Sequence, residues 1–237
     1  MKDHARIVSA SQHAASLFLS VRPTRPEYEL STDELQVAVR IRLGLAPIPS
    51  ERAGRVSTSF EAMNRLAGNQ VGCAQRHNLV CKALIGLIRE AGGSATSEPL
   101  VHQGASQHRG DIEANLSVIS ADTLVIDATV IAPTCASYVE RSQTALGAAR
   151  VAEQRKHEFY NSRHLIVGHK KLSVFALEAF GALGPGARAL LEVVARQAEA
   201  TRLMSYRSFL VHGKAVISAA LQRGNRVLVH KAPRHFQ

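Results

Sequence analysis

The chain has 237 residues, of which 46% are hydrophobic, so it can bury a sizeable core and is not expected to be globally disordered. Its 29 Lys and Arg residues outnumber 19 Asp and Glu residues, which gives a net charge of +10 and favours nucleic acid as a partner over a membrane surface. No apolar run is long enough to span a bilayer, and three cysteines without a long apolar leader argue against a disulfide-rich secreted protein. We therefore expect an intracellular protein, nuclear or mitochondrial.

The first part of the chain, residues 1–72, is predicted to be an N-terminal extension of helices and loops. A short helix is expected over Ala10–Leu19, followed by a linker with several prolines. Ser31 and Glu34 have the spacing of a capping box and predict the start of a second helix. Later residues of the extension show weak periodicity and are expected to be loop, with one short helix at Phe60–Leu66.

Residues 73–200 alternate between helical and strand-like hydrophobic patterns. The order helix, three strands, helix, strand, helix predicts an α/β domain with a mixed central β-sheet flanked by helices. The predicted elements are a helix from His77 to Gly92, strands at Ser97–His102, Ile112–Ser120 and Leu124–Ile131, a helix at Thr144–Ser162, a strand at Leu172–Phe180 and a helix at Ala187–Ala200.

Residues 201–237 contain no acidic residue and are predicted to form a basic C-terminal helix and tail. The pattern predicts a helix over Tyr206–Leu221, a turn at Gly224-Asn225 and a short strand at Arg226–Val229. An unopposed cationic segment attracts phosphate backbones because condensed counterions are released. We expect nucleic-acid contacts from its basic side chains, which are Arg202, Arg207, Lys214, Arg223, Arg226, Lys231 and Arg234.

Two aspartates and a lysine form the candidate chemical site. Asp127 interrupts an apolar strand, where an unpaired carboxylate is costly, and Asp111 precedes the neighbouring strand. The chain reversal brings both carboxylates toward one end of the sheet, provided that the connection is longer than a two-residue turn. Converging carboxylates suit Mg²⁺ or Mn²⁺. Lys156 and Tyr160 share the sheet-facing side of the next helix, where Lys156 can orient an attacking water, although a structural ion pair with Asp127 fits the spacing equally well.

These residues belong to a series of short motifs that spans roughly residues 15–230. The motifs include Leu30-Ser31-x-Asp33-Glu34, Arg76-His77-Asn78, Glu98-Pro99-Leu100, Arg109-Gly110-Asp111-Ile112, Val125-Ile126-Asp127-Ala128-Thr129-Val130, Glu153-xx-Lys156-xxx-Tyr160 and Leu221-Gln222-Arg223-Gly224-Asn225. In order and spacing they resemble the restriction-enzyme-like endonuclease domain of non-LTR retrotransposons, which belongs to the PD-(D/E)xK nuclease superfamily.

The resemblance implies a restriction-endonuclease-like fold in which Asp111 and Asp127 bind a divalent metal ion. It also implies that Lys156 is the catalytic lysine, displaced from the strand to the helix, and that Tyr160 is the aromatic residue that follows it. Cleavage in this family leaves 3′-hydroxyl and 5′-phosphate ends. The motif expected near the DNA backbone consists of Arg76, His77 and Asn78.

The sequence also departs from the family pattern. Gly110 replaces the proline that usually precedes the first aspartate, and only Cys73 and His77 remain of the usual zinc knuckle. Two ligands do not make a structural zinc site, so no zinc is expected, and Cys81 is expected to lie in the core. Glu178 has no assigned role and is expected to be a surface or satisfied polar position.

Two functions remain open at this point. The first is an active Mg²⁺- or Mn²⁺-dependent endonuclease acting on DNA. The second is a catalytically silent, domesticated domain that binds RNA as a structural subunit of a ribonucleoprotein, such as a mitochondrial ribosome, together with other proteins of that assembly. Nucleic-acid binding is common to both, and no membrane association is expected from either.

Overall fold

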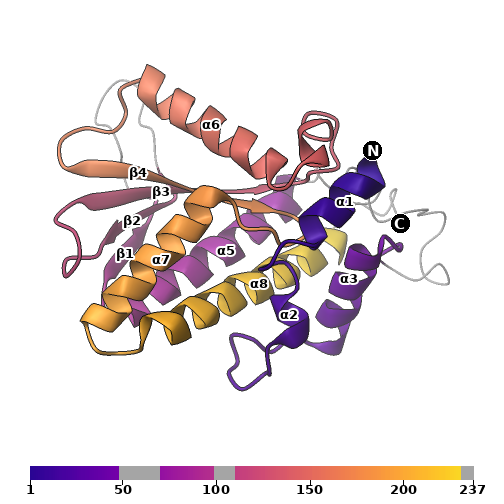
Figure 1. Cartoon of the computed structure of the whole chain (residues 1–237), viewed down its shortest axis with the longest axis horizontal. Coiled ribbons are helices and arrows are strands. Elements are labelled where there is room, and N and C mark those ends of the chain that lie inside the picture. Colours follow the sequence, from indigo (N-terminus) through magenta and orange to yellow (C-terminus); the bar gives the residue numbers. More distant parts are fainter. Residues whose placement is uncertain (48–69, 99–109, 231–237) are drawn as a thin grey trace.

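The computed structural model describes residues 1–47, 70–98 and 110–230 (Figure 1). In these ranges the chain forms a four-stranded mixed sheet with helices on both faces, so the predicted α/β class with a mixed, helix-flanked sheet is confirmed. The predicted helix at Phe60–Leu66 and the basic residues Lys231 and Arg234 lie outside the described residues.

Three helices precede the sheet: α1 (Lys2–Ala10), α2 (Leu17–Ser20) and α3 (Thr32–Leu43). The predicted helix at Ala10–Leu19 is wrong, because the side chains of Ser11 and Gln12 donate hydrogen bonds back to the Val8 carbonyl where α1 ends. The predicted capping box is confirmed. Ser31 Oγ accepts from the Glu34 N–H at 3.3 Å, and Glu34 Oε2 accepts from the Ser31 N–H at 2.8 Å.

Helices and strands of the central region follow one another in the predicted order. One helix and three strands are followed by a helix, a strand and two further helices. The sheet order is β1-β2-β3-β4, with β2 antiparallel to both neighbours and β3 parallel to β4 through the α6 crossover. The elements are α5 (Gln70–Glu90), β1 (Ser94–Ser97), β2 (Ile112–Asn115), β3 (Thr123–Ile131), the 3₁₀ turn η1 (Arg141–Gln143), α6 (Gly147–Ser162), β4 (Lys170–Glu178), α7 (Pro185–Ala200) and α8 (Tyr206–His230).

The start of α5 and the position of β1 differ from the prediction. Within the described residues α5 spans Gln70–Glu90, so it already includes the two turns before His77, where Arg76 is buried in spite of weak hydrophobic periodicity. β1 spans Ser94–Ser97, so strand structure begins before the predicted strand at Ser97–His102, of which residues 99–102 lie outside the described residues.

The connection between β2 and β3 is longer than predicted. β2 ends at Asn115 rather than at Ser120, and residues 116–122 form the loop. The N–H groups of Ile119 and Ser120 both donate to the Leu116 carbonyl, which folds the chain back on itself. This loop supplies the extra length that alignment of the two aspartates requires.

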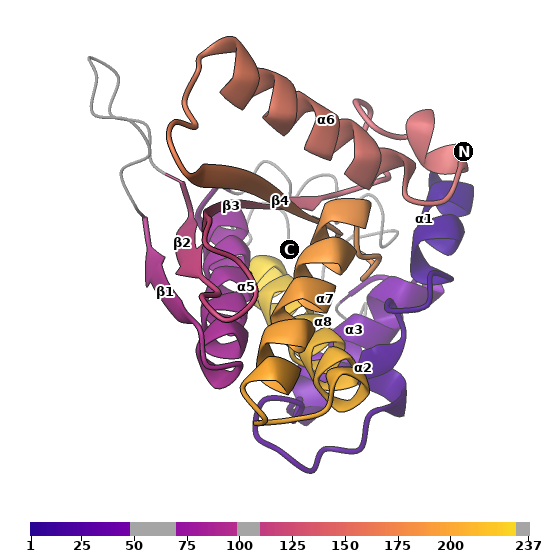
Figure 2. The ribbon, with the colours of Figure 1, turned by 60° about the vertical axis from the view of Figure 1, so that its left-hand side comes forward.

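The sheet separates two layers of helices. Figure 2 shows α6 lying across one face, while α5, α7 and α8 lie on the other. Side chains of β3 alternate between the layers. Ile126 and Ala128 join the core beneath α5 and α7, whereas Val125 and Ile131 pack toward α6. Asp127 therefore lies on the α6 face.

Residues 206–230 of the acid-free C-terminal segment form α8, which packs along α5 and α7 as a core helix. The predicted turn at Gly224-Asn225 and the predicted strand at Arg226–Val229 are wrong, because both elements are part of this helix. Gly224 lies against Arg76, and the buried Asn225 Nδ2 donates to the Ala179 carbonyl at 3.0 Å. Among the described residues, no helix combines the length and apolarity needed to cross a membrane.

Candidate active site

The two candidate aspartates meet where β2 and β3 pair. Ile112 is the partner of Ile126, so one residue beyond the ladder Asp111 lies opposite Asp127. Asp111 Oδ2 accepts a hydrogen bond of 2.7 Å from the Ala128 N–H. The Asp111 carboxylate thus accepts a hydrogen bond from a backbone N–H group of β3 at the point where β2 begins. This hydrogen bond fixes the orientation of the carboxylate.

Asp127 is buried against α6. Lys156 Nζ lies 3.0 Å from Oδ1 and 3.0 Å from Oδ2 of Asp127, whose side chain is only 7% exposed. Burial raises the pKa of the Tyr160 hydroxyl far above its ordinary value, and the charge of Asp127 and a hydrogen bond to it act in the same direction. Tyr160 therefore stays protonated and donates to Asp127.

The N-terminus of α6 is anchored by a second buried carboxylate. Glu178, at the end of β4, accepts a hydrogen bond of 3.2 Å from the Ala149 N–H in the first turn of α6. Burial raises the pKa of this carboxyl, against hydrogen bonds from Ser9 and from the N–H groups of Ala148 and Ala149. Glu178 is a satisfied polar residue, as predicted, and it fixes the helix that carries Lys156.

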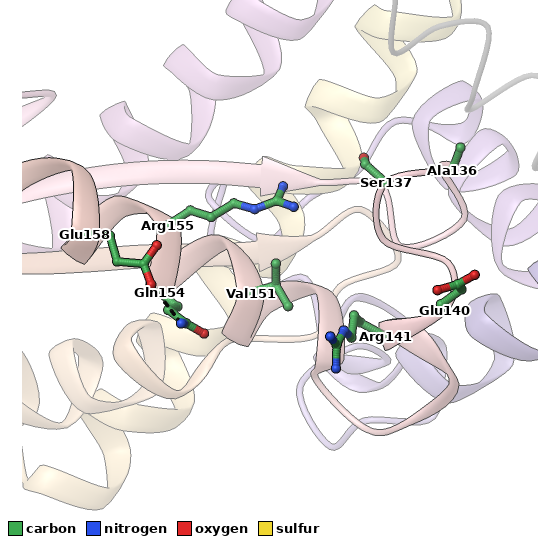
Figure 3. Close-up of a pocket in the computed structure, with 8 residues that line it drawn as sticks. All are labelled: Ala136, Ser137, Glu140, Arg141, Val151, Gln154, Arg155 and Glu158. Atoms are coloured by element: carbon green, nitrogen blue, oxygen red, sulfur yellow. Dashed lines mark hydrogen bonds between the residues drawn. The ribbon is translucent and has the colours of Figure 1, made fainter.

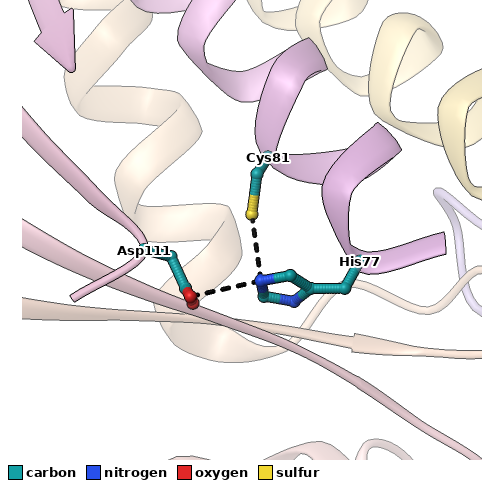
Figure 4. A group of neighbouring side chains, drawn as sticks. All are labelled: His77, Cys81 and Asp111. Carbon is teal, nitrogen blue, oxygen red and sulfur yellow. Dashed lines mark hydrogen bonds and ion pairs between the residues drawn. The ribbon is translucent and has the colours of Figure 1, made fainter. Parts of the chain in front are cut away.

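His77 joins Asp111 from the other side of the sheet edge (Figure 4). Its Nε2 lies 3.2 Å from Asp111 Oδ1 and 3.4 Å from Cys81 Sγ. Hydrogen bonds to Asp111 and then to Cys81 raise the pKa of His77 to about 10, so the ring carries a positive charge at neutral pH. Burial acts to raise the pKa of Asp111, but the hydrogen bonds from His77 and Ala128 and the charges of His77 and Lys156 hold it below its ordinary value.

The structure therefore brings the predicted catalytic set together. Asp111 and Asp127 are neighbours across two strands, Lys156 and Tyr160 contact Asp127, and the charge of Asp111 acts on both α6 residues. His77 also belongs to this site, because it contacts Asp111. The sequence predicted that it would lie near a nucleic-acid backbone instead.

The remaining residues of the Arg76-His77-Asn78 motif have different environments. Arg76 is buried and donates to Asn225 Oδ1 at 3.2 Å, so it ties α5 to α8 and is not available for the phosphate contact expected of it. Asn78 is exposed and lines a cavity of about 230 Å³ together with His77, Asp111 and Lys82.

The basic residues of the C-terminal segment that the structure describes, up to His230, do not form a surface around this site. Thr201 Oγ1 donates to the Ala91 carbonyl at 3.1 Å, which places the turn before α8 at the far end of α5. The part of α5 between His77 and this end is about 21 Å long at the rise of an α-helix, so the turn lies far from the candidate site. Arg202 and Arg207, on either side of that turn, are exposed.

The other described cations of this segment are partly engaged with protein groups. Arg223 donates to the carbonyls of Pro26 and Glu29, and Arg226 pairs with Asp33 at 2.8 Å. Lys214 is half-buried and lines a small cavity between α1 and α7. These contacts brace the N-terminal segment against α8.

A larger cavity, of about 410 Å³, lies on the solvent side of α6 (Figure 3). Val151, Gln154, Arg155 and Glu158 line it from the helix, and Arg141 lines it from η1. Lys156 and Tyr160 face the sheet instead, so this cavity is separate from the candidate catalytic set.

Sequence reasoning missed Cys81 and Lys82 as site residues. Cys81 was assigned to the core, where it does lie, but its sulfur also faces His77. The spacing His77-xxx-Cys81 within one predicted helix was the available signal, because residues four apart lie on the same helix side.

The donor set of the aspartates fits a hard divalent cation. Asp127 is a buried carboxylate whose two oxygens are both held by a cationic ammonium, and Asp111 adds a second carboxylate across the strand pair. Carboxylate oxygens are the ligands that Mg²⁺ and Mn²⁺ prefer. Comparison of the chain with models of known protein families and with curated protein sequences gave no match.

Proposed function

We propose that the protein is a Mg²⁺- or Mn²⁺-dependent endonuclease that hydrolyses phosphodiester bonds in DNA. The observation that carries this proposal is that Asp111 lies opposite Asp127 on paired strands while Lys156 of α6 pairs with Asp127.

The arrangement of the sheet gives further support. A helix, a three-stranded antiparallel meander, a crossover helix and a fourth parallel strand place Asp127 against α6 and Asp111 opposite it on the neighbouring strand. We infer that this is a restriction-endonuclease-like fold of the retrotransposon type, in which the catalytic lysine comes from the helix. Thr129 stands on β3 where a strand lysine would otherwise be expected.

In this proposal Asp111 and Asp127 hold the metal ion, which supplies charge neutralisation of the phosphate and activation of the attacking water. Lys156, once released from Asp127, orients that water and stabilises the charge that develops on the phosphate. Tyr160 donates to Asp127 and holds its carboxylate in place while Lys156 moves. His77 positions Asp111 from the opposite side.

The alternative is a silent RNA-binding subunit of a ribonucleoprotein. Its main support was the acid-free C-terminal segment, taken as a tail that threads between phosphates. That segment is α8, largely buried against α5 and α7, so this reason no longer applies to residues 206–230. The net charge of +10 supports both functions equally.

The test is a cleavage assay on supercoiled plasmid and on single-stranded DNA with Mg²⁺ or Mn²⁺. We expect the wild-type protein to nick or linearise the substrate and Asp127→Asn to be inactive while remaining folded by circular dichroism. Cleavage that persists in Asp127→Asn, or a folded wild-type protein that never cleaves, excludes this function.

A further inference from the structure

We propose that His77, Cys81 and Asp111 form a second metal site, selective for a zinc-class transition metal ion. One donor atom from each residue lies within 4.8 Å of the others, and Figure 4 shows His77 Nε2 facing both the thiol and the carboxylate. The site lies beside the Asp111–Asp127 pair but differs from it in ligand chemistry.

The distances between donor atoms match tetrahedral coordination. In a tetrahedral zinc site, bonds of about 2.0–2.3 Å put an imidazole nitrogen about 3.3 Å from a carboxylate oxygen and about 3.6 Å from a thiolate sulfur. His77 Nε2 lies 3.2 Å from Asp111 Oδ1 and 3.4 Å from Cys81 Sγ. Two edges of the tetrahedron therefore already have nearly the right length, and the third, between Cys81 Sγ and the Asp111 carboxylate, is no longer than 4.8 Å.

Local structure explains why these atoms meet. His77 and Cys81 are four residues apart on α5, so their side chains lie on adjacent turns of the same side. The Ala128 N–H holds Asp111 Oδ2 at 2.7 Å, which turns Oδ1 toward the imidazole. A hydrogen bond that orients a ligating carboxylate is typical of metal sites in proteins.

The ligand types select the metal. A thiolate is a poor ligand for Mg²⁺ or Ca²⁺, whereas a mixed sulfur, nitrogen and oxygen set suits Zn²⁺ and Co²⁺. Three protein ligands leave a fourth position, which opens on the cavity of about 230 Å³ that Glu98 and Lys82 also line. A three-ligand site of this kind accepts a water or an exchangeable ligand rather than serving as a closed structural site.

This inference replaces the expectation of no zinc, which counted only Cys73 and His77 as ligands. Cys73 does not belong to the described cluster. The site shares Asp111 with the proposed endonuclease site, so the two proposals are tested at residues that they do not share. Substitution of Asp127 tests cleavage, and substitution of Cys81 tests the second site.

Cobalt substitution provides a direct test on the full-length protein. Titration with Co²⁺ is expected to give a thiolate-to-cobalt charge-transfer band and tetrahedral d–d bands, and one equivalent of Zn²⁺ is expected to remove them. Cys81→Ser is expected to lose the charge-transfer band and to weaken Zn²⁺ binding by more than about 100-fold, a larger loss than that of an outer-shell partner. Cys73→Ser and Cys135→Ser are matched controls that keep the band.

The possible outcomes separate the two proposals. The second site is overturned if Cys81→Ser retains the charge-transfer band. It is also overturned if the folded wild-type protein shows no such band. Asp127→Asn is expected to keep the cobalt spectrum while losing cleavage, whereas Cys81→Ser is expected to lose the cobalt charge-transfer band. Loss of the cobalt spectrum in Asp127→Asn, with the fold intact by circular dichroism, would contradict the assignment of Cys81 and His77 as the ligands.

Discussion

Lys156 and Asp127 form an ion pair in which one ammonium nitrogen lies 3.0 Å from each carboxylate oxygen. The carboxylate is buried, while the lysine side chain is 40% exposed. The ammonium therefore neutralises an internal charge from the solvent side and occupies the space next to Asp127 that a metal ion requires. In the proposed function, binding of a metal ion at Asp127 would have to separate this pair.

The first prediction concerns stability. Lys156→Met leaves Asp127 buried with only the Tyr160 hydroxyl as a partner, so we expect the free energy of unfolding to fall by about 1–3 kcal/mol. This is less than the loss of a fully buried pair, because solvent reaches Lys156 and screens the interaction. Urea denaturation followed by circular dichroism measures the change.

Lys171→Met is the control for that measurement. Lys171 pairs with Asp122 at 2.5 Å, but the lysine is 66% exposed, so we expect its loss to leave the free energy of unfolding nearly unchanged. Equal effects of the two substitutions would contradict the view that the Asp127 charge is buried.

The second prediction is a pH dependence of stability. The hydrogen bond to Asp111, followed by the one to Cys81, raises the pKa of His77 from 6.5 to about 10. A group with a raised pKa in the folded state contributes stability that is complete below its unfolded pKa and is lost as the pH rises through its folded pKa. We therefore expect the stability difference between wild type and His77→Gln to be largest near pH 6 and to disappear above about pH 10.

Urea denaturation of both proteins across this pH range provides the measurement. Other titrating groups are common to the two proteins and cancel in the difference. A difference that stays constant from about pH 6 to about pH 10 would show that the Asp111 carboxylate does not hold a proton on His77.

The third prediction tests α8 as a core helix. A Cβ atom at Gly224 would lie 2.5 Å from Arg76 Cγ and 2.9 Å from Arg76 Cα, so Gly224→Ala must push α8 away from α5. We expect a loss of about 1–3 kcal/mol. The matched control is Gly86→Ala on the exposed side of α5, where nothing lies within 4 Å and alanine should stabilise the helix by about 0.5–1 kcal/mol. If α8 were a loose tail, Gly224→Ala would be neutral or stabilising.

The sequence predicted much of this architecture because the relevant signals are local. The Ser31 and Glu34 capping box depends on a four-residue pattern, and the order of strands and helices after His77 depends on hydrophobic periodicity. Asp127 stood out because a charge within an apolar strand needs a partner, and Lys156 because it shares a helix side with Tyr160. These features gave the candidate site.

What the sequence could not give depends on tertiary contacts. Gly224-Asn225 is a typical turn pair, but close packing against Arg76 and the buried hydrogen bonds of Asn225 keep it helical. The alignment of Asp111 with Asp127 depends on the length of loop 116–122, which periodicity does not define. The sequence places His77 at the start of a helix, and periodicity alone does not predict that its side chain contacts Asp111.

The fourth prediction places the nucleic-acid surface beside Asp111. Lys82 is exposed and lines the cavity that includes Asp111, whereas Arg202 lies at the far end of α5. We expect Lys82→Glu to weaken DNA binding strongly and to reduce the salt dependence of binding by about one counterion. Arg202→Glu, an equal charge reversal, should have a smaller effect. Fluorescence anisotropy at several salt concentrations measures both, and a larger effect at Arg202 would place the surface at the other end of the helix.

The most direct test of the account compares the rates of metal-dependent DNA cleavage by Asp127→Asn and Glu113→Gln. Both substitutions remove a carboxylate of the same sheet that pairs with a lysine, since Asp127 pairs with Lys156 of α6 and Glu113 lies 2.6 Å from Lys170. The account predicts that Asp127→Asn loses cleavage in Mg²⁺ and Mn²⁺ by at least about 1,000-fold, as expected when a metal ligand is removed, while Glu113→Gln cleaves at nearly the wild-type rate. Equal rates for the two variants, or no cleavage by the folded wild-type protein, would contradict it.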